Sequence, residues 1–204
     1  TNALGSATSN AATLTVTSPP VILAHPTNQT VTVGADASFT AVAGGNPAPT
    51  YQWQVSTNGG TSFTDLTNAA PYGGVTTNIL AITSTTAGLT GNQYRVIAAN
   101  AVGTATSNAA TLTVITIPPA ITTQPIHQTV VAPAAVSFMV AASGAPAPTY
   151  QWQVSTDGGT TFTDLTDTAP YSGVTTATLM ITGTTLSLNG HRYRAVATNT
   201  VGSA

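Results

Sequence analysis

The sequence predicts an all-β fold in which two similar domains follow one another, and three observations lead to this prediction. The block APTYQWQVST at residues 48–57 recurs unchanged at residues 147–156, and the match continues at a constant offset of 99 residues. In short runs, apolar side chains alternate with polar ones, which is typical of half-buried antiparallel strands. Gly-containing turns separate the runs, and there is almost no helix signal. About seven short strands per repeat favour Greek-key β-sandwiches.

The repeat length sets the domain organisation, because about 100 residues form one small domain rather than a turn of a solenoid. A partial third copy stands at the N-terminus, where residues 1–16 match residues 99–114 at an offset of 98. We expect the last strand of a preceding or neighbouring domain at 1–16, linkers at 17–20 and 115–119, a first domain at 21–114, and a second domain without its own last strand at 120–204. The paired prolines of both linkers favour stiff, extended connections.

The strands of the first repeat follow from its alternating runs. The turn Thr57–Gly60 supplies the glycines that a tight hairpin requires, and Ala101-Val102-Gly103 turns the chain into its last strand. The expected strands contain, in order, Ala37, Phe39, Ala41 and Ala43; Tyr51, Trp53 and Val55; residues 79–82; Tyr94, Val96, Ala98 and Asn100; and residues 105–114.

Composition excludes several classes of partner. Only 4% of residues are charged, the net charge is −2, and the chain has neither Lys nor Glu. Without a basic cluster, nucleic acid is a poor candidate partner, and the same argument excludes an anionic membrane surface. Cysteine is absent, so each domain must be held by its core alone. The Thr, Ser, Asn and Gln-rich surface suits an extracellular or cell-surface location, and no segment predicts a membrane span.

Two spaced motifs occur in both repeats. The first motif is Ala41, Ala43, Gly45, Pro47, Pro49, Tyr51 and Trp53, repeated as Val140, Ala142, Gly144, Pro146, Pro148, Tyr150 and Trp152. The second is Tyr94, Val96, Ala98, Asn100 and Gly103, repeated as Tyr193, Ala195, Ala197, Asn199 and Gly202. Together they resemble the immunoglobulin superfamily, in particular its I-set, and bacterial surface proteins that carry many such domains in series.

The resemblance implies a core and a departure from the family pattern. Its four cysteine positions hold Ala41 with Val96 and Val140 with Ala195, so we expect each small and larger pair to fill the gap of the family disulfide. It also places Trp53 and Trp152 between the sheets. The expected structural core is Ala41, Trp53, Tyr94, Val96, Val140, Trp152, Tyr193 and Ala195.

The sequence predicts no catalytic residue, cofactor or metal, and therefore no enzyme. His25, His127 and His191 correspond to Gln124, Asn28 and Asn92 in the other repeat, so no histidine recurs. Asp157, Asp164 and Asp167 are the only candidates for a calcium site, and the first repeat offers just Asp65 at the matching positions. Tyr72 and Tyr171 are the candidate ligand contacts, although packing at a sheet edge is the favoured role for both.

The leading functional hypothesis is a structural repeat module of an extracellular bacterial surface protein, forming a rod-like stalk, an adhesin shaft or a filament. The alternatives are a glycan- or protein-binding module and an accessory domain of a secreted enzyme. The expected partners are like domains of the same protein, and a surface glycan or protein in the second case. Residues 5–16, with Ala7, Leu14 and Val16, are the candidate strand donor in a head-to-tail polymer; the other explanation is that a longer tandem protein is represented in part.

Overall fold

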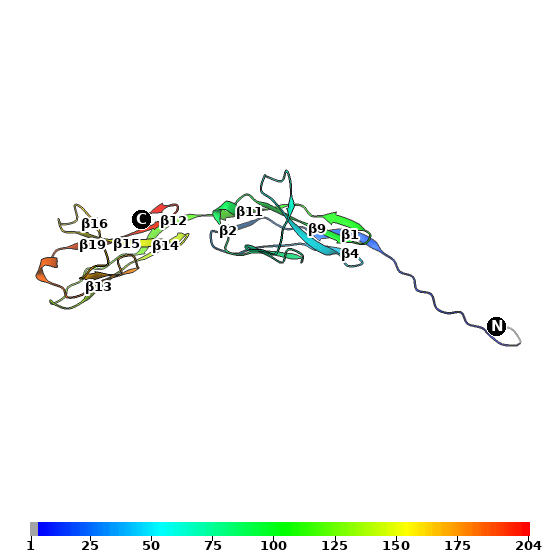
Figure 1. Ribbon diagram of the computed structural model, residues 1–204, viewed down its shortest axis with the longest axis horizontal. Helices are drawn as coiled ribbons and strands as arrows, with labels where there is room; N and C mark the ends of the chain where they lie inside the picture. The colour runs from blue at the N-terminus through cyan, green and yellow to red at the C-terminus, as the bar shows by residue number, and fades with distance from the viewer. Residues whose placement is uncertain (1–3) are drawn as a thin grey trace. The chain divides into compact units, whose positions relative to one another are not determined.

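Strand pairing sorts the described chain into two sets in the computed structural model (Figure 1), which describes residues 4–204. Within that range strands β1 to β11 pair only with one another, and strands β12 to β20 pair only with one another. We call the two sets the first and the second sandwich. The predicted all-β class with tandem sandwiches is confirmed. Thr1, Asn2 and Ala3, which belong to the expected strand at 1–16, lie outside the described residues.

The first sandwich contains three sheets. Strand β1 pairs with β4, the order β3-β8-β7 forms a second sheet, and the order β2-β11-β9-β5-β6 forms the largest sheet, with β10 also beside β9. A 3-10 turn, Ala87–Leu89, precedes β9. The strands are β1 Ser18–Ala24, β2 Gln29–Thr32, β3 Ala37–Thr40, β4 Val42–Asn46, β5 Thr50–Ser56, β6 Thr64–Asp65, β7 Tyr72–Gly73, β8 Ile79–Ile82, β9 Gln93–Asn100, β10 Gly103–Thr106 and β11 Ala110–Ile115.

The second sandwich repeats this plan with fewer strands. Its sheets have the orders β12-β14, β13-β18-β17 and β16-β15-β19-β20, and a 3-10 turn, Leu186–Leu188, precedes β19. The strands are β12 Ile117–Thr123, β13 Val136–Met139, β14 Ala141–Ala145, β15 Thr149–Ser155, β16 Thr163–Asp164, β17 Tyr171–Ser172, β18 Thr178–Ile181, β19 Arg192–Asn199 and β20 Gly202–Ser203.

The segments expected as linkers differ from the sequence-based expectation. Ile117, Pro118 and Pro119 belong to β12, where Ile117 lies opposite Ala145 of β14, and Ser18–Pro20 belongs to β1 in the same way. Proline favours an extended conformation in the residue before it and is tolerated on an edge strand, so paired prolines fit the start of such a strand. Thr116 is the single residue between β11 and β12.

Within this chain residues 6–17 form no strand, whereas the sequence predicts that residues 1–16 are the last strand of a preceding or neighbouring domain. Residues 6–17 run away from β1 without a neighbouring strand (Figure 1), and every one of them is exposed. Leu14 and Val16 are 87% and 68% exposed. The Asn46 side-chain amide donates a hydrogen bond to the Val16 carbonyl oxygen at 2.5 Å.

Each sandwich is built around one tryptophan. Trp53 and Trp152 are fully buried, and their indole N–H groups donate to the carbonyl oxygens of Thr77 and Thr176, both at 2.9 Å. A buried N–H requires such an acceptor, which fixes the orientation of the ring. Ala41, Tyr94 and Val96 are fully buried in the first sandwich, and Val140 is 5% exposed in the second. Their counterparts Tyr193 and Ala195 are only half-buried.

We predict that Ala41→Val alone destabilises the first sandwich by about 1–3 kcal/mol, because an extra side-chain volume overpacks a closed core. Combining it with Val96→Ala conserves the volume of the pair and should restore nearly the original stability. Thermal denaturation of both variants measures this. Equal melting temperatures for the single and the double variant would show that the two side chains do not share one space.

Candidate functional site

Strand β11 closes the first sandwich. Ala110 and Leu112 are fully buried and Val114 is 7% exposed, so the strand covers the core with one face. One edge of β11 bonds to the segment that leads into β9: Leu112 N–H donates to the Asn92 carbonyl at 2.9 Å, and Gly91 N–H donates to the Leu112 carbonyl at 2.8 Å. Strand β2 occupies its other edge. The strand therefore provides both core surface and hydrogen bonds to two neighbours.

Among residues 4–204, the second sandwich has no strand in the position that β11 holds in the first. Strand β20 pairs with the end of β19, where Thr198 lies opposite Ser203, and Ala197 and Ala204 exchange two hydrogen bonds of 2.9 Å. From Arg192 to Val196, the strand neighbour of β19 within the described range is β15 alone. One edge of the sheet is open over this stretch.

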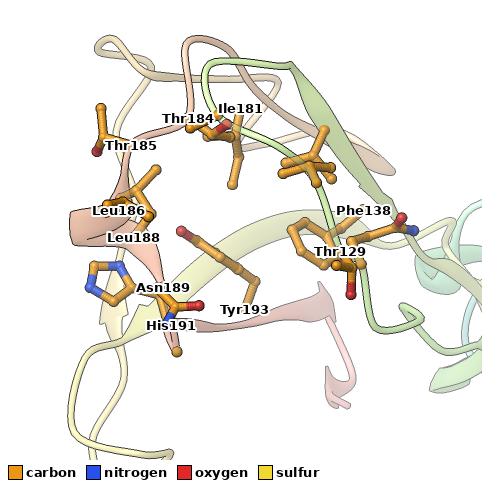
Figure 2. A pocket seen from close by; sticks show the side chains of 15 residues that line it. Thr129, Phe138, Ile181, Thr184, Thr185, Leu186, Leu188, Asn189, His191 and Tyr193 are labelled. Carbon is orange, nitrogen blue, oxygen red and sulfur yellow. The ribbon is translucent and has the colours of Figure 1, made fainter.

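The open edge borders a groove of about 240 Å³ (Figure 2). Phe138, Ile181, Leu188 and Tyr193 come from separate segments and supply its apolar side chains, while Asn189 and His191 lie at one end. The equivalent residues of the first sandwich, Phe39, Ile82 and Tyr94, are fully buried. Phe138 and Tyr193 are half-buried instead, with their ring centroids 5.1 Å apart. The groove is thus core surface that lacks a cover.

Two further features accompany the missing cover. Residues 128–131, the counterpart of β2, form no strand, and Val131 is 85% exposed. In the first sandwich β2 pairs with β11, so its counterpart lacks the same neighbour. The buried Nδ1 atom of His191 has no hydrogen-bond partner. A buried polar atom without a partner is destabilising.

The candidate ligand contacts pack within the protein. The Tyr72 and Tyr94 hydroxyl groups lie 3.4 Å apart, and their ring centroids are separated by 6.1 Å. The hydroxyl groups of Tyr171 and Tyr193 are likewise 3.4 Å apart, and their ring centroids 6.1 Å apart. Burial, together with the hydrogen bond to Tyr72, raises the pKa of Tyr94 above its usual range. Both candidates are half-buried, so neither ring forms an open platform for stacking a sugar.

The largest sheet of the first sandwich carries a polar relay that the sequence did not lead us to expect and that recurs in the second sandwich. The Arg95 guanidinium stacks over the Phe63 ring at 3.9 Å and donates through Nε to Gln54 Oε1 at 2.8 Å. Gln54 Nε2 in turn donates to Asp65 Oδ1 at 2.7 Å. Arg194, Phe162, Gln153 and Asp164 form the same relay in the second sandwich. The recurrence of both arginines at an offset of 99 is the signal that could have revealed it.

The other two acidic residues of the second repeat, Asp157 and Asp167, accept hydrogen bonds from nearby residues. Asp157 accepts hydrogen bonds from Ser155 and from the backbone N–H groups of residues 160 and 161. The Thr161 hydroxyl and backbone hold the pKa of Asp157 well below its usual range. Asp167 accepts from Val174 N–H at 3.1 Å. Across residues 4–204, no three His, Asp or Glu side chains gather as a metal site would require.

Comparison with known proteins identifies the fold family. Residues 19–100 match the family model described as an immunoglobulin domain. The chain is a tandem of immunoglobulin-like domains. The first five immunoglobulin domains of Sidekick-1 superpose on it with a TM-score of 0.65 at 23% identity, covering 92% of this chain and 38% of that one. The titin domains Z1Z2 in complex with telethonin give a TM-score of 0.51 at 24% identity, covering 93% and 94%.

The immunoglobulin-like tandem also resembles segments of long proteins. It is 37% identical to endoglucanase C of Cellulomonas fimi over 189 residues, which are 93% of this chain and 16% of that protein. It is 35% identical to Roundabout homolog 1 of Homo sapiens over 153 residues, which are 75% of this chain and 9% of that protein. The chain therefore spans less than a fifth of the length of these relatives. Among the described residues, no helix has the length and apolar character needed to cross a membrane.

The raised pKa of Tyr94 predicts alkaline destabilisation. An ionised Tyr94 is disfavoured in the folded state, so the stability that depends on its neutral form is complete below pH 10 and declines as pH rises above the ordinary tyrosine pKa of about 10. Tyr94→Phe should reduce this decline. Urea denaturation at pH 8 and pH 11 measures the difference, and an equal loss in both proteins would contradict it.

Proposed function

We propose that these immunoglobulin-like domains act as a structural repeat module, a spacer within a stalk, adhesin shaft or filament of an extracellular bacterial surface protein. The observation that carries the proposal is the short connection: Thr116 alone separates β11 from β12. One residue supplies few free backbone torsions, so it limits the independent movement of the domains that it joins. A low content of charged residues and the absence of cysteine are compatible with an extracellular location.

The start of each domain is also fixed to that domain. Asn199 Nδ2 donates to the Ile117 carbonyl at 2.9 Å and to the Pro146 carbonyl at 2.8 Å. Asn100 makes the equivalent bonds to Ser18 and Pro47. These bonds attach the first residues of β12 and β1 to the body of the sandwich, so the connection cannot lengthen without breaking them. This supports a spacer of limited flexibility.

A glycine in each repeat makes this attachment possible. A Cβ atom on Gly144 would lie 3.3 Å from Pro119 Cα and 3.1 Å from Asn199 Nδ2, and Gly45 is equally crowded by Pro20 and Asn100. Any side chain at these positions would push the incoming strand away from the asparagine. Two residues of the recurrent motifs, Gly and Asn, thus support the junction rather than a ligand.

The similarity to endoglucanase C favours a second candidate, an accessory domain of a secreted enzyme whose catalytic part lies outside this chain. A spacer of limited flexibility would suit that role as well. Recognition of a glycan through Tyr72 and Tyr171 gains less support, because both rings pack against tyrosines of the core. The proposed partners are therefore like domains of the same protein. We propose that they join either in tandem or head to tail, through strand donation by residues 5–16.

Small-angle X-ray scattering tests the spacer at concentrations where the chain is monomeric. We expect a narrow distribution of interdomain distances, and a broader one after insertion of a six-residue Gly-Ser segment following Thr116. The same insertion in the exposed hairpin at residues 157–160 serves as the control and should leave the distribution narrow. A distribution already as broad in the unmodified chain would refute the proposal.

We predict that Asn199→Ala loosens the junction without unfolding the second domain. Loss of the two bonds to Ile117 and Pro146 should broaden the interdomain distances part of the way toward the Gly-Ser insertion. Circular dichroism should still report a folded β protein. Asn108→Ala is a matched control, since Asn108 is exposed and lies away from β12 in sequence. Identical scattering for Asn199→Ala and the parent chain would show that the asparagine does not restrain the junction.

A further inference from the structure

We propose that Asn58, in the hairpin between β5 and β6, is a site of spontaneous deamidation, and that the folded hairpin holds the aspartate that forms. The inference is independent of the proposed spacer function. Asn58 and Gly59 are both exposed, so water reaches the pair. An asparagine followed by glycine is the sequence in which this reaction is least hindered, because glycine has no side chain to obstruct attack by its own backbone nitrogen.

The backbone nitrogen of Gly59 is available for the reaction. Among residues 4–204 its N–H has no hydrogen-bond partner, whereas the neighbouring Gly60 N–H donates to Ser56 Oγ at 2.9 Å. Gly59 has a φ angle of 70°, which glycine adopts without strain. No other part of the protein crowds this position, since a Cβ atom on Gly59 would have no non-neighbouring atom within 4 Å. The attacking nitrogen is therefore neither blocked nor held in another hydrogen bond.

The Asn58 side-chain amide is held by hydrogen bonds that favour attack at its carbon. Its Oδ1 atom accepts from Ser56 Oγ at 2.8 Å and from Ser62 N–H at 3.0 Å. Its Nδ2 atom donates to Ser62 Oγ at 2.8 Å. Two donors on a carbonyl oxygen stabilise the negative charge that develops there when the carbon is attacked. The hairpin therefore activates the same amide that it orients.

The reaction balances with water as the only co-reactant. The Gly59 N–H loses its proton to base, and its nitrogen forms a bond to Asn58 Cγ. Because the two groups belong to neighbouring residues, this attack is intramolecular, which gives a high effective concentration. The Cγ–Nδ2 bond then breaks, and Nδ2 takes up a proton and leaves as ammonia. Water opens the resulting cyclic imide at Cγ, which restores the Gly59 amide and leaves a carboxylic acid at residue 58.

The second repeat shows how this hairpin holds an aspartate, because Asp157 occupies the position of Asn58 there. Its Oδ1 atom accepts from Ser155 Oγ at 2.7 Å, and its Oδ2 atom accepts from the Thr161 hydroxyl at 2.6 Å. The hydroxyl of Ser62, at the position of Thr161, can rotate to donate in the same way once an oxygen has replaced Nδ2. The bonds from Thr161 hold the pKa of Asp157 well below its usual range, so an aspartate at residue 58 would be ionised at neutral pH.

The product adds a negative charge to the hairpin, in a chain whose net charge is only −2, and it keeps the bonds of the loop. The alternative product, isoaspartate, forms when water opens the imide at the backbone carbon. It would convert the Asn58 backbone carbonyl, which accepts from Thr61 Oγ1 at 3.1 Å, into a side-chain carboxylate and lengthen the main chain. We therefore expect aspartate to be the main product in the folded chain.

Peptide mass spectrometry on the folded chain during storage tests the reaction. The peptide that contains residue 58 should shift to the mass of the acid, and faster at mildly alkaline than at neutral pH, because the attack requires loss of the Gly59 proton. Asn58→Gln is the matched control: it retains an amide at this exposed position but would have to close a larger ring, so its mass should stay unchanged. An unchanged residue 58 in the folded chain, after the urea-unfolded chain has reacted completely, would overturn the proposal.

The variant Asn58→Asp tests whether the hairpin holds the product. Its first domain should melt at the same temperature as that of the parent chain or higher, because the carboxylate keeps the bonds that the amide accepts. Asn58→Ala is the control and should melt lower, since it removes the oxygen that accepts from Ser56 and Ser62. A melting temperature of Asn58→Asp as low as that of Asn58→Ala would refute the fit of the product. Comparison of the reacted peptide with synthetic standards identifies the acid, and isoaspartate as the main product would likewise contradict it.

Discussion

The last strand of the immunoglobulin-like repeat is the element that covers one side of the core and closes one edge of the largest sheet. A strand in a two-layer fold must cover the core with one face and satisfy backbone groups along its edges. Strand β11 meets both requirements, burying Leu112 while bonding to residues 91 and 92. Where its counterpart is missing, Tyr193 loses part of its burial, residues 128–131 form no strand, and His191 Nδ1 lacks a partner. His191, Tyr193 and residues 128–130 all border the same groove.

The two ends of a repeat have opposite roles in this arrangement. At its start, β12 is attached to the sandwich by Asn199, and Gly144 allows the close approach that this bond requires. At its end, a strand closes the sheet and leads after one residue into the next domain. The stretch of chain that closes the first sandwich therefore also connects it to the second.

Much of the fold was predictable, because repetition and alternation are local properties that the sequence states directly. The offset of 99 gave two matched sandwiches, and the positions of Trp53 and Trp152 follow from alternation and from the family resemblance. The extent of β12 was not predictable, since two prolines fit a linker as well as an edge strand. The relay of Arg95, Gln54 and Asp65 was not predictable either. Its members lie on β9, β5 and β6, and they come together only because these strands pair. The groove was also not predictable, because it borders the edge of β19 that has no strand neighbour, and strand pairing is not a local property of the sequence.

Hydrogen–deuterium exchange on the dilute, monomeric chain tests the central claim that β11 closes the first sandwich. Amides in segments 128–139 and 190–196 should exchange faster than those in segments 29–40 and 91–97, which hold the equivalent positions of the first repeat. Core amides of Trp53 and Trp152 should be protected in both sandwiches. Equal protection of the paired segments in the monomer would contradict the account, because it would mean that the second sandwich is closed without a strand in the position of β11.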